Sequence, residues 1–229
     1  MKSKLIGLTG SKGVLGKEIL KNFKNFKILK YNNDIRDKKK LYNWLLKNNF
    51  DGIIHLAAVV ATSDVLKNKK KAKDVNYYST KNLVDFIIKL KKKNTWIFFA
   101  STSHVYRFSK KKLKENIKCN PQNYYGYTKY LAERYLLKKK LNVCIGRIFS
   151  YSSKNQKKSF FIPSIIEKLK FSKNNIIKVE NVNHYRDFLT TKEIVDAIKI
   201  LFKNKSTGIY NICSSKKVKL VDIIKTINK

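Results

Sequence analysis

Tyr125 and Lys129, in the segment NYYGYTK, are spaced for acid–base chemistry. Residues four apart on a helix lie on one face, so the phenol and the ammonium group would be neighbours. A free tyrosine has a pKa of about 10 and is a poor base at neutral pH, whereas a nearby ammonium group lowers that pKa. We therefore expect Tyr125 to move a proton to or from a substrate oxygen. Chance explains the pair equally well, because both residue types are abundant here.

A cluster of hydroxyl side chains, Ser101, Thr102 and Ser103, follows Ala100 at the end of an apolar run. In a doubly wound sheet, ligands bind at the carboxyl ends of the strands. A hydroxyl at that place can donate a hydrogen bond to a substrate carbonyl oxygen. The alternative is that the cluster only caps a turn or a helix. Its position on the strand that leads into the Tyr125 helix favours a site.

Three glycines spaced GxxGxxG, in the segment TGSKGVLG, follow the first apolar run and open the first helical pattern. This context is typical of a dinucleotide-binding loop, in which glycines allow a tight turn, the approach of a pyrophosphate and close helix packing. The free N–H groups of the helix N-terminus then face the phosphates. A plain structural turn is the alternative. We expect cofactor contacts from Gly10, Lys12, Gly13, Val14, Leu15 and Gly16.

No carboxylate stands at the tip of the second expected strand, where Lys30, Tyr31, Asn32 and Asn33 occur instead. An acidic residue at this tip usually binds the adenosine ribose of NAD. A 2′-phosphate would not be repelled here, and Lys30 could help to hold it. The sequence therefore leans towards NADP over NAD, while Asp34 is expected nearer the adenine edge.

Short apolar runs alternate with amphipathic stretches over about the first 150 residues, which predicts βαβ units. The expected fold class is α/β, a Rossmann-like doubly wound parallel sheet with a small, shortened C-terminal substrate-binding part. We expect an NAD(P)-binding Rossmann domain in residues 1–150 and a short substrate-binding region in 151–229 that returns strands to the sheet. Strands are expected at 5–9, 26–31, 52–58, 96–100, 143–149, 176–179 and 209–212. Helices are expected at 14–23, 38–47, 75–90, 124–137, 161–169, 191–202 and from 220.

The chain is strongly basic, with 52 lysines and arginines against 15 acidic residues and a formal charge of +37. Such a surface attracts polyanions, including nucleic acid. Compositional drift is the alternative, because arginine is scarce and the lysines are scattered, whereas phosphate-gripping surfaces favour arginine. We interpret the charge as drift and do not expect a nucleic-acid partner.

Neither the cysteines nor the hydropathy indicates a metal site, a disulfide framework or a membrane protein. Three widely spaced cysteines do not have disulfide or zinc spacing, and Cys144 lies in an apolar run typical of a buried strand. No apolar run reaches the length of about 18 residues that a spanning helix needs, and the first residues do not have a signal-peptide pattern. We expect a cytoplasmic protein without a bound metal.

Together these motifs resemble the epimerase/dehydratase branch of the extended short-chain dehydrogenase/reductase superfamily, which acts mostly on nucleotide sugars. Further matching segments are DIRD at 34–37, HLAA at 55–58, VN at 75–76 with TKNL at 80–83, STSHVY at 101–106, YRDF at 185–188 and GIYNI at 208–212. The match covers nearly the whole chain.

The resemblance implies NAD or NADP as cofactor and Thr102, Tyr125 and Lys129 as the catalytic residues. Lys129 would also bind the nicotinamide ribose, and hydride would pass between the nicotinamide and a sugar carbon. A homodimer through the helices at 75–90 and 124–137 is also implied. Further cofactor contacts would come from Asp34, Ile35, Leu56, Ala57, Ala58, Asn76 and Ala100, and substrate contacts from Ser103 and Arg186, which would bind the nucleotide diphosphate.

Two departures from the family pattern bear on function. Ser103-His104 replaces the Asp-Glu that dehydratases of this branch carry beside the catalytic threonine, which argues against dehydration. The substrate-binding part is short, so its pocket is expected to be open or completed by another subunit. The hypotheses are a nucleotide-sugar epimerase or 4-keto-sugar reductase and, as the alternative, a non-catalytic dinucleotide-binding protein with a polyanion-binding surface.

Overall fold

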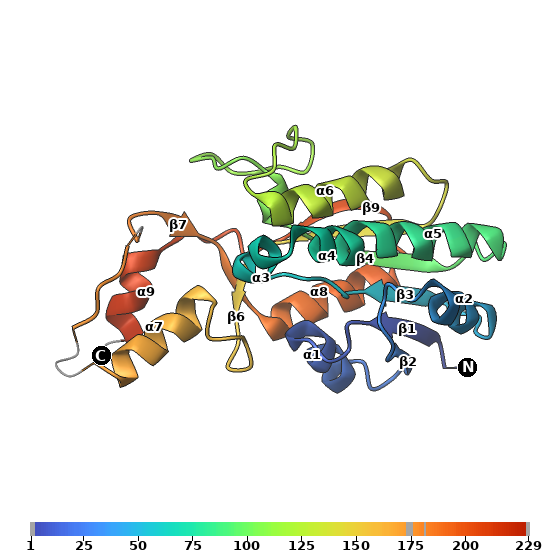
Figure 1. The fold of residues 1–229 in the computed structure, drawn as a ribbon, viewed down its shortest axis with the longest axis horizontal. Helices are drawn as coiled ribbons and strands as arrows, with labels where there is room; N and C mark the ends of the chain where they lie inside the picture. The colour runs from blue at the N-terminus through green and yellow to red at the C-terminus, as the bar shows by residue number, and fades with distance from the viewer. Residues whose placement is uncertain (1–2, 173–175, 181, 228–229) are drawn as a thin grey trace.

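The computed structural model describes residues 3–172, 176–180 and 182–227 (Figure 1). Within these residues one sheet has the strand order β2-β1-β3-β4-β5-β9, and every neighbouring pair is parallel. The order runs from β1 to β2 in one direction and from β1 to β3 in the other, which is the doubly wound topology. The expected fold class is therefore confirmed. The strands are β1 (Leu5–Thr9), β2 (Lys27–Tyr31), β3 (Gly52–His55), β4 (Trp96–Thr102), β5 (Val143–Ile148) and β9 (Gly208–Ile212).

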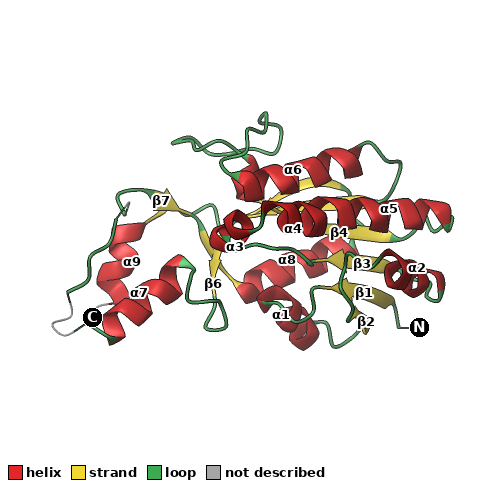
Figure 2. Cartoon of the chain, viewed as in Figure 1, coloured by secondary structure: helices red, strands yellow, loops and turns green. Residues whose placement is uncertain are grey.

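Helices cover both faces of this sheet (Figure 2). One face packs against α1 (Val14–Asn22) and α8 (Thr191–Lys203). The other face packs against α2 (Lys38–Leu46), α5 (Ser79–Lys89) and α6 (Tyr124–Leu137). Because both faces are covered, the strands are continuous apolar runs rather than alternating ones, and all six residues of β5 are buried.

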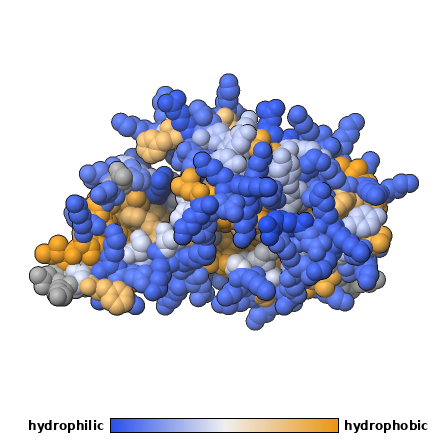
Figure 3. Space-filling model, in the orientation of Figure 1, coloured by the Kyte–Doolittle hydropathy of each residue, from blue (hydrophilic) through white to orange (hydrophobic). Residues whose placement is uncertain are grey.

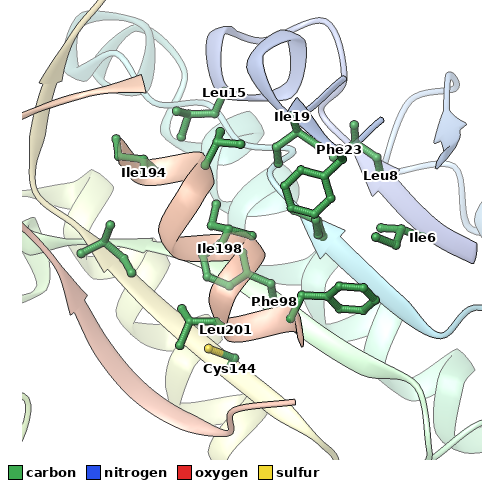
Figure 4. Packing of buried hydrophobic residues seen from close by; sticks show 14 of the residues in the cluster. Ile6, Leu8, Leu15, Ile19, Phe23, Phe98, Cys144, Ile194, Ile198 and Leu201 are labelled. Atoms are coloured by element: carbon green, nitrogen blue, oxygen red, sulfur yellow. The ribbon is translucent and has the colours of Figure 1, made fainter. Parts of the chain in front are cut away.

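Helix α8 shows how the sequence builds one of these layers (Figure 4). Its apolar residues recur with the helical period, and Ile194 and Ile198 are fully buried against the sheet. A capping box between Thr190 and Glu193 fixes its start. Cys144 of β5 is fully buried in this core, as expected for a small apolar side chain.

Three details of the expected secondary structure are wrong. Strand β3 ends at His55, because the next residues turn towards the end of β1, where the Leu56 N–H donates to the Thr9 carbonyl over 3.3 Å. Residues 176–179 form no strand. The helix expected at 75–90 is α5 preceded by a single wide turn, Asp74–Tyr78.

Two short helices were not expected at all: α3 (Thr62–Lys67) and α4 (Lys69–Lys73). Their lysine-rich sequence has little apolar periodicity, so it gives no helical signal. They are held instead by the burial of Val65 and Ala72 against the start of α6.

The remaining elements form a smaller lobe at the end of the molecule opposite the N-terminus (Figure 1). We use "the lobe" for β6 (Ser150–Ser152), α7 (Phe161–Lys170), β7 (Tyr185–Arg186), β8 (Phe188–Thr190), β10 (Val218–Lys219) and α9 (Leu220–Ile227). Strand β6 pairs with β8 in parallel, and β7 pairs with β10 antiparallel. These pairings bring the residues around Arg186 back towards the sheet.

The molecular surface is hydrophilic over most of the visible face and carries scattered apolar patches (Figure 3). The hydrophilic side chains are spread over many elements rather than gathered on one. In the part of the chain that the structure describes, no helix combines the length and apolar character that crossing a bilayer requires.

Candidate active site

A pocket of ≈ 1080 Å³ lies at the carboxyl ends of the strands, between the sheet and the lobe. The loops that follow β1, β2, β3, β4 and β5 form one wall, and Arg186, Phe188 and Leu220 of the lobe contribute to the other. This is the place where open α/β sheets bind ligands. The pocket brings together most of the site residues that the sequence predicts.

The glycine loop lines one end of this pocket, and all six of its predicted contact residues belong to the lining. Gly10 has a φ of +73°, and a Cβ atom there would lie 2.7 Å from the backbone nitrogen of Ala57. A Cβ atom on Gly16 would lie 2.3 Å from the carbonyl oxygen of Gly10. The loop therefore needs glycine at both places to turn and to pack. Helix α1 begins directly after it at Val14, so its first N–H groups are available to phosphates.

The loop after β2 lines the end of the pocket where the sequence predicts the adenosine, and Asp34 and Ile35 both contribute to it. The Asp34 carboxylate accepts hydrogen bonds from Arg36, over 3.0 Å from Nε and 2.5 Å from the second guanidinium nitrogen. These hydrogen bonds lower the pKa of Asp34 to about 2. Lys30 is exposed and does not line the pocket, whereas Arg36 and Lys71 do.

The HLAA segment contributes Leu56, Ala57 and Ala58 to the pocket, whereas His55 lies behind them. His55 is fully buried between two hydroxyls, with Nδ1 2.7 Å from Thr9 Oγ1 and Nε2 3.0 Å from Thr80 Oγ1. Burial lowers the pKa of His55 to about 3, so the ring is neutral. It joins β1, β3 and α5 as a structural residue.

Thr102 and Tyr125 both line the pocket beside Ala100. Thr102 is the last residue of β4. Tyr125 lies in the first turn of α6, because Asn123 caps that helix by accepting a hydrogen bond from the Gly126 N–H over 2.9 Å. The two side chains therefore reach the same cavity from neighbouring elements.

Lys129 lies behind Tyr125 rather than on the pocket surface. Its side chain is buried, and its amino group is 3.9 Å from the centroid of the Phe99 ring. Burial lowers the pKa of Lys129 to about 7, while the carboxylate of Glu133 opposes that shift.

The pKa of Tyr125 is raised by burial and by the nearby Tyr151 phenol, while the Thr102 hydroxyl acts in the opposite direction. From the sequence we expected Lys129 to lower the pKa of Tyr125. In the folded chain the pKa of Tyr125 is raised instead, so that expectation is wrong. The physical reason is that both side chains are removed from water, which favours the neutral form of each. Tyr125 is therefore present as a phenol, which is the proton-donating form.

A buried ionic network lies behind Lys129, and the sequence analysis missed it. The Glu133 carboxylate accepts a hydrogen bond over 2.7 Å from Arg147, with both side chains almost fully buried, and another from the Ser101 hydroxyl. Arg147 also donates to the Tyr106 hydroxyl over 2.7 Å. Glu133 is four residues after Lys129 on α6, and this spacing was the available signal.

Asn76 does not line the pocket, although the family pattern implied a cofactor contact. Its side chain is fully buried, accepts from the Val59 N–H over 2.8 Å and donates to the Val59 carbonyl over 3.0 Å. It also donates to the Thr128 hydroxyl over 3.0 Å. Asn76 therefore braces the loop after β3 against α6.

Ser103 and Arg186 both line the substrate end of the pocket, as expected. Arg186 is partly buried in β7, and burial lowers the pKa of its guanidinium. The structure adds Tyr151, Gln156 and His104 to this end, none of which was predicted as a site residue. Tyr151 lies in β6, three residues after the end of β5, so its place near the carboxyl end of a predicted strand was the available signal. Among the described residues, no group of three or more His, Cys, Asp or Glu side chains could hold a metal ion.

A glycine loop between β1 and α1, a doubly wound parallel sheet and a tyrosine–lysine helix beside the same pocket are features of the extended short-chain dehydrogenase/reductase type. The family model that matches, over residues 14–229, is described as GDP-mannose 4,6 dehydratase. The chain belongs to this family.

Curated relatives include a dTDP-D-glucose 4,6-dehydratase of Dictyostelium discoideum, 27% identical over 220 residues, which are 89% of this chain and 50% of the relative. A UDP-glucose 4-epimerase of Mycoplasma genitalium is 27% identical over 205 residues, which are 81% of this chain and 60% of the relative. The chain thus spans about half to three fifths of the length of these relatives.

Solved structures confirm the fold. RMD of Pseudomonas aeruginosa, complexed with NADPH, has a TM-score of 0.86 at 21% identity, and the match covers 97% of this chain and 80% of that one. The UDP-glucose 4-epimerase of Thermus thermophilus, in complex with NAD, has a TM-score of 0.83 at 15% identity, with 97% and 82% covered.

Proposed function

We propose that this chain is an NAD(P)-dependent nucleotide-sugar epimerase or 4-keto-sugar reductase. The observation that carries the proposal is that Thr102 and Tyr125 share one pocket with the glycine loop. This arrangement supports the proposal, because a hydroxyl and a phenol beside a dinucleotide held by that loop could both reach the oxygen of a substrate carbonyl. The division into a cofactor part, residues 1–150, and a substrate part, residues 151–229, stays a prediction that rests on these roles.

The bound dinucleotide would supply the hydride chemistry. In the reducing direction, the Tyr125 phenol donates its proton to the carbonyl oxygen of the substrate as that carbon is reduced to a carbinol. Thr102 donates a hydrogen bond to the same oxygen and holds it in place. By the family resemblance Lys129 would hold the nicotinamide ribose, and Arg186 would bind the diphosphate of the nucleotide.

The cofactor part of the proposal is tested by titrating the protein with NADH and with NADPH, followed by fluorescence. Saturable binding is expected for wild type and not for Gly13→Trp, whose bulky side chain would occupy the pyrophosphate position. Binding of neither dinucleotide to wild type would contradict the proposal. The expected absence of metal and of a nucleic-acid partner and the expected homodimer stay predictions.

The catalytic part is tested with Tyr125→Phe, which removes the phenolic proton but keeps the ring. We expect a loss of turnover of about 10²–10⁴-fold with little change in dinucleotide affinity, because acid–base catalysis contributes about that factor. Turnover on nucleotide sugars separates the two activities, since a reductase consumes NAD(P)H in proportion to product and an epimerase does not. Equal turnover in wild type and Tyr125→Phe would remove Tyr125 from the mechanism.

A further inference from the structure

His104 lies in the pocket wall between Thr102 and Tyr125, and its backbone is held from several sides. Its N–H donates to Thr102 Oγ1 over 3.2 Å, and its carbonyl accepts from the Gln122 N–H over 3.0 Å. Its carbonyl also packs so closely on α6 that a Cβ atom on Gly126 would lie 2.2 Å from it. A position fixed this firmly beside the reacting groups is suited to a precise contact with a ligand.

The hydrogen bonds of Asn123 determine where the ring of His104 carries its proton. Asn123 caps α6 through its oxygen, Oδ1, which accepts from the Gly126 N–H over 2.9 Å. Its amide nitrogen therefore faces the imidazole and donates to His104 Nδ1 over 2.8 Å. A ring nitrogen that accepts a hydrogen bond bears no proton, so the neutral ring is protonated on Nε2.

The surroundings of His104 keep the ring neutral. Burial lowers its pKa, and the guanidinium of Arg186 lowers it further, while the hydrogen bond with Asn123 acts in the opposite direction. The ring of Tyr125 packs edge-on against it, with 5.8 Å between the centroids, and carries no charge. Within the described ranges, Nε2 of His104 has no hydrogen-bond partner. It is also not one of the polar atoms that are fully buried without a hydrogen bond, so it is accessible from the pocket.

We propose that His104 is a fixed hydrogen-bond donor to the sugar of the substrate, through Nε2–H, and that it cannot serve as a general base. Its Nδ1 lone pair is engaged by Asn123, and its Nε2 carries the proton, so neither nitrogen can take a proton from carbon. Eliminating water from a sugar beside a carbonyl requires such a base. His104 therefore does not supply that base, and the inference, which rests on the proposed function, deepens it by naming a side chain that contacts the sugar.

The tautomer is tested by nitrogen NMR of the protein labelled with ¹⁵N-histidine. The His104 signals are assigned by their loss in His104→Gln. At pH 7 we expect a neutral ring with Nε2 protonated. A ring protonated on Nδ1, or an imidazolium at pH 7, would overturn the proposal whether or not a substrate has been found.

Two asparagine variants test the cause of this tautomer. Asn123→Asp keeps an oxygen to cap α6 but turns an oxygen towards Nδ1, so we expect a proton on Nδ1 and a raised pKa of His104. Asn68→Asp is the matched control, because Asn68 caps α4 in the same way by accepting from the Lys71 N–H over 2.8 Å. The His104 signals should be unchanged in the control, and unchanged signals in Asn123→Asp as well would contradict the argument.

The contact with substrate is tested by comparing His104→Gln with His104→Leu. Glutamine can present an N–H near the position of Nε2, whereas leucine cannot. The probes are UDP-glucose and dTDP-glucose, added to the NADPH-bound protein. We expect their affinity to fall by about 10-fold or more in His104→Leu and by less than about 3-fold in His104→Gln. NADPH affinity should be unchanged in both.

Several results separate the failure of this inference from that of the proposed function. Equal sugar-nucleotide binding by wild type and His104→Leu overturns the inference. Wild type that binds no dinucleotide contradicts the proposed function instead, and the imidazole signals still decide the tautomer.

Discussion

The sheet and the lobe build opposite walls of one pocket, but they are stabilised very differently. In the sheet, β3 and β5 are buried at every residue, and a buried ion pair joins α6 to β5. In the lobe, α7 buries Ile165, α9 buries Leu220, and neither residue of β7 is buried. The wall formed by the sheet should therefore tolerate few substitutions, whereas the wall formed by the lobe should tolerate more.

The largest expected contrast lies between two glutamates that form ion pairs. Glu133→Gln leaves the buried Arg147 without a charged partner, and we expect the free energy of unfolding to fall by about 3–5 kcal/mol. Glu167→Gln breaks the exposed pair with Lys158 in the lobe and should change it by less than about 1 kcal/mol. Urea denaturation measures both changes in the free energy of unfolding. Equal changes would mean that the ion pair in the sheet region stabilises the protein no more than the one in the lobe.

A smaller effect is expected from alanine in the glycine loop. Gly16→Ala forces a methyl group against the Gly10 carbonyl, and we expect a destabilisation of about 2–3 kcal/mol. In Gly13→Ala the nearest atom to the new methyl group, also the Gly10 oxygen, is 3.3 Å away, so the fold should be affected much less. Thermal unfolding with and without NADPH compares them. A Gly13→Ala protein as unstable as Gly16→Ala would contradict this account of the loop.

The last expected effect has the opposite sign, because Lys129→Met should increase the free energy of unfolding. Burial lowers the pKa of Lys129 from 10.5 to about 7, so between these values the unfolded chain binds a proton that the folded chain gives up. Wild type should therefore lose stability as the pH falls from about 10 to 7. Methionine removes this penalty, and we expect a gain in stability at pH 7 that disappears towards pH 10.5.

The control for this prediction is Lys81→Met, since Lys81 is partly exposed and paired with Asp85. It should change the free energy of unfolding by less than about 1 kcal/mol at either pH. A Lys129→Met protein that is less stable than wild type at pH 7 would show that the pairing of Lys129 with its surroundings outweighs its burial. Dinucleotide affinity, measured alongside, should fall in Lys129→Met and not in the control.

Local patterns determined much of this protein. The glycine spacing after β1 predicted the loop, because backbone turns depend on neighbouring residues. Apolar runs predicted the strands of the sheet, and α6 has the bounds that the sequence indicated. The offset of Tyr125 and Lys129 placed them on one face of that helix, since helical geometry depends only on separation along the chain.

Only the tertiary structure decided the contacts between distant segments. It buried Tyr125 and Lys129, so that Tyr125 is a phenol and the pKa of Lys129 is lowered, left Lys30 outside the pocket, and paired Glu133 with Arg147. It also fixed the proton of His104 through Asn123. Desolvation and hydrogen-bond partners across the fold set these properties, and neither is encoded in local residue spacing.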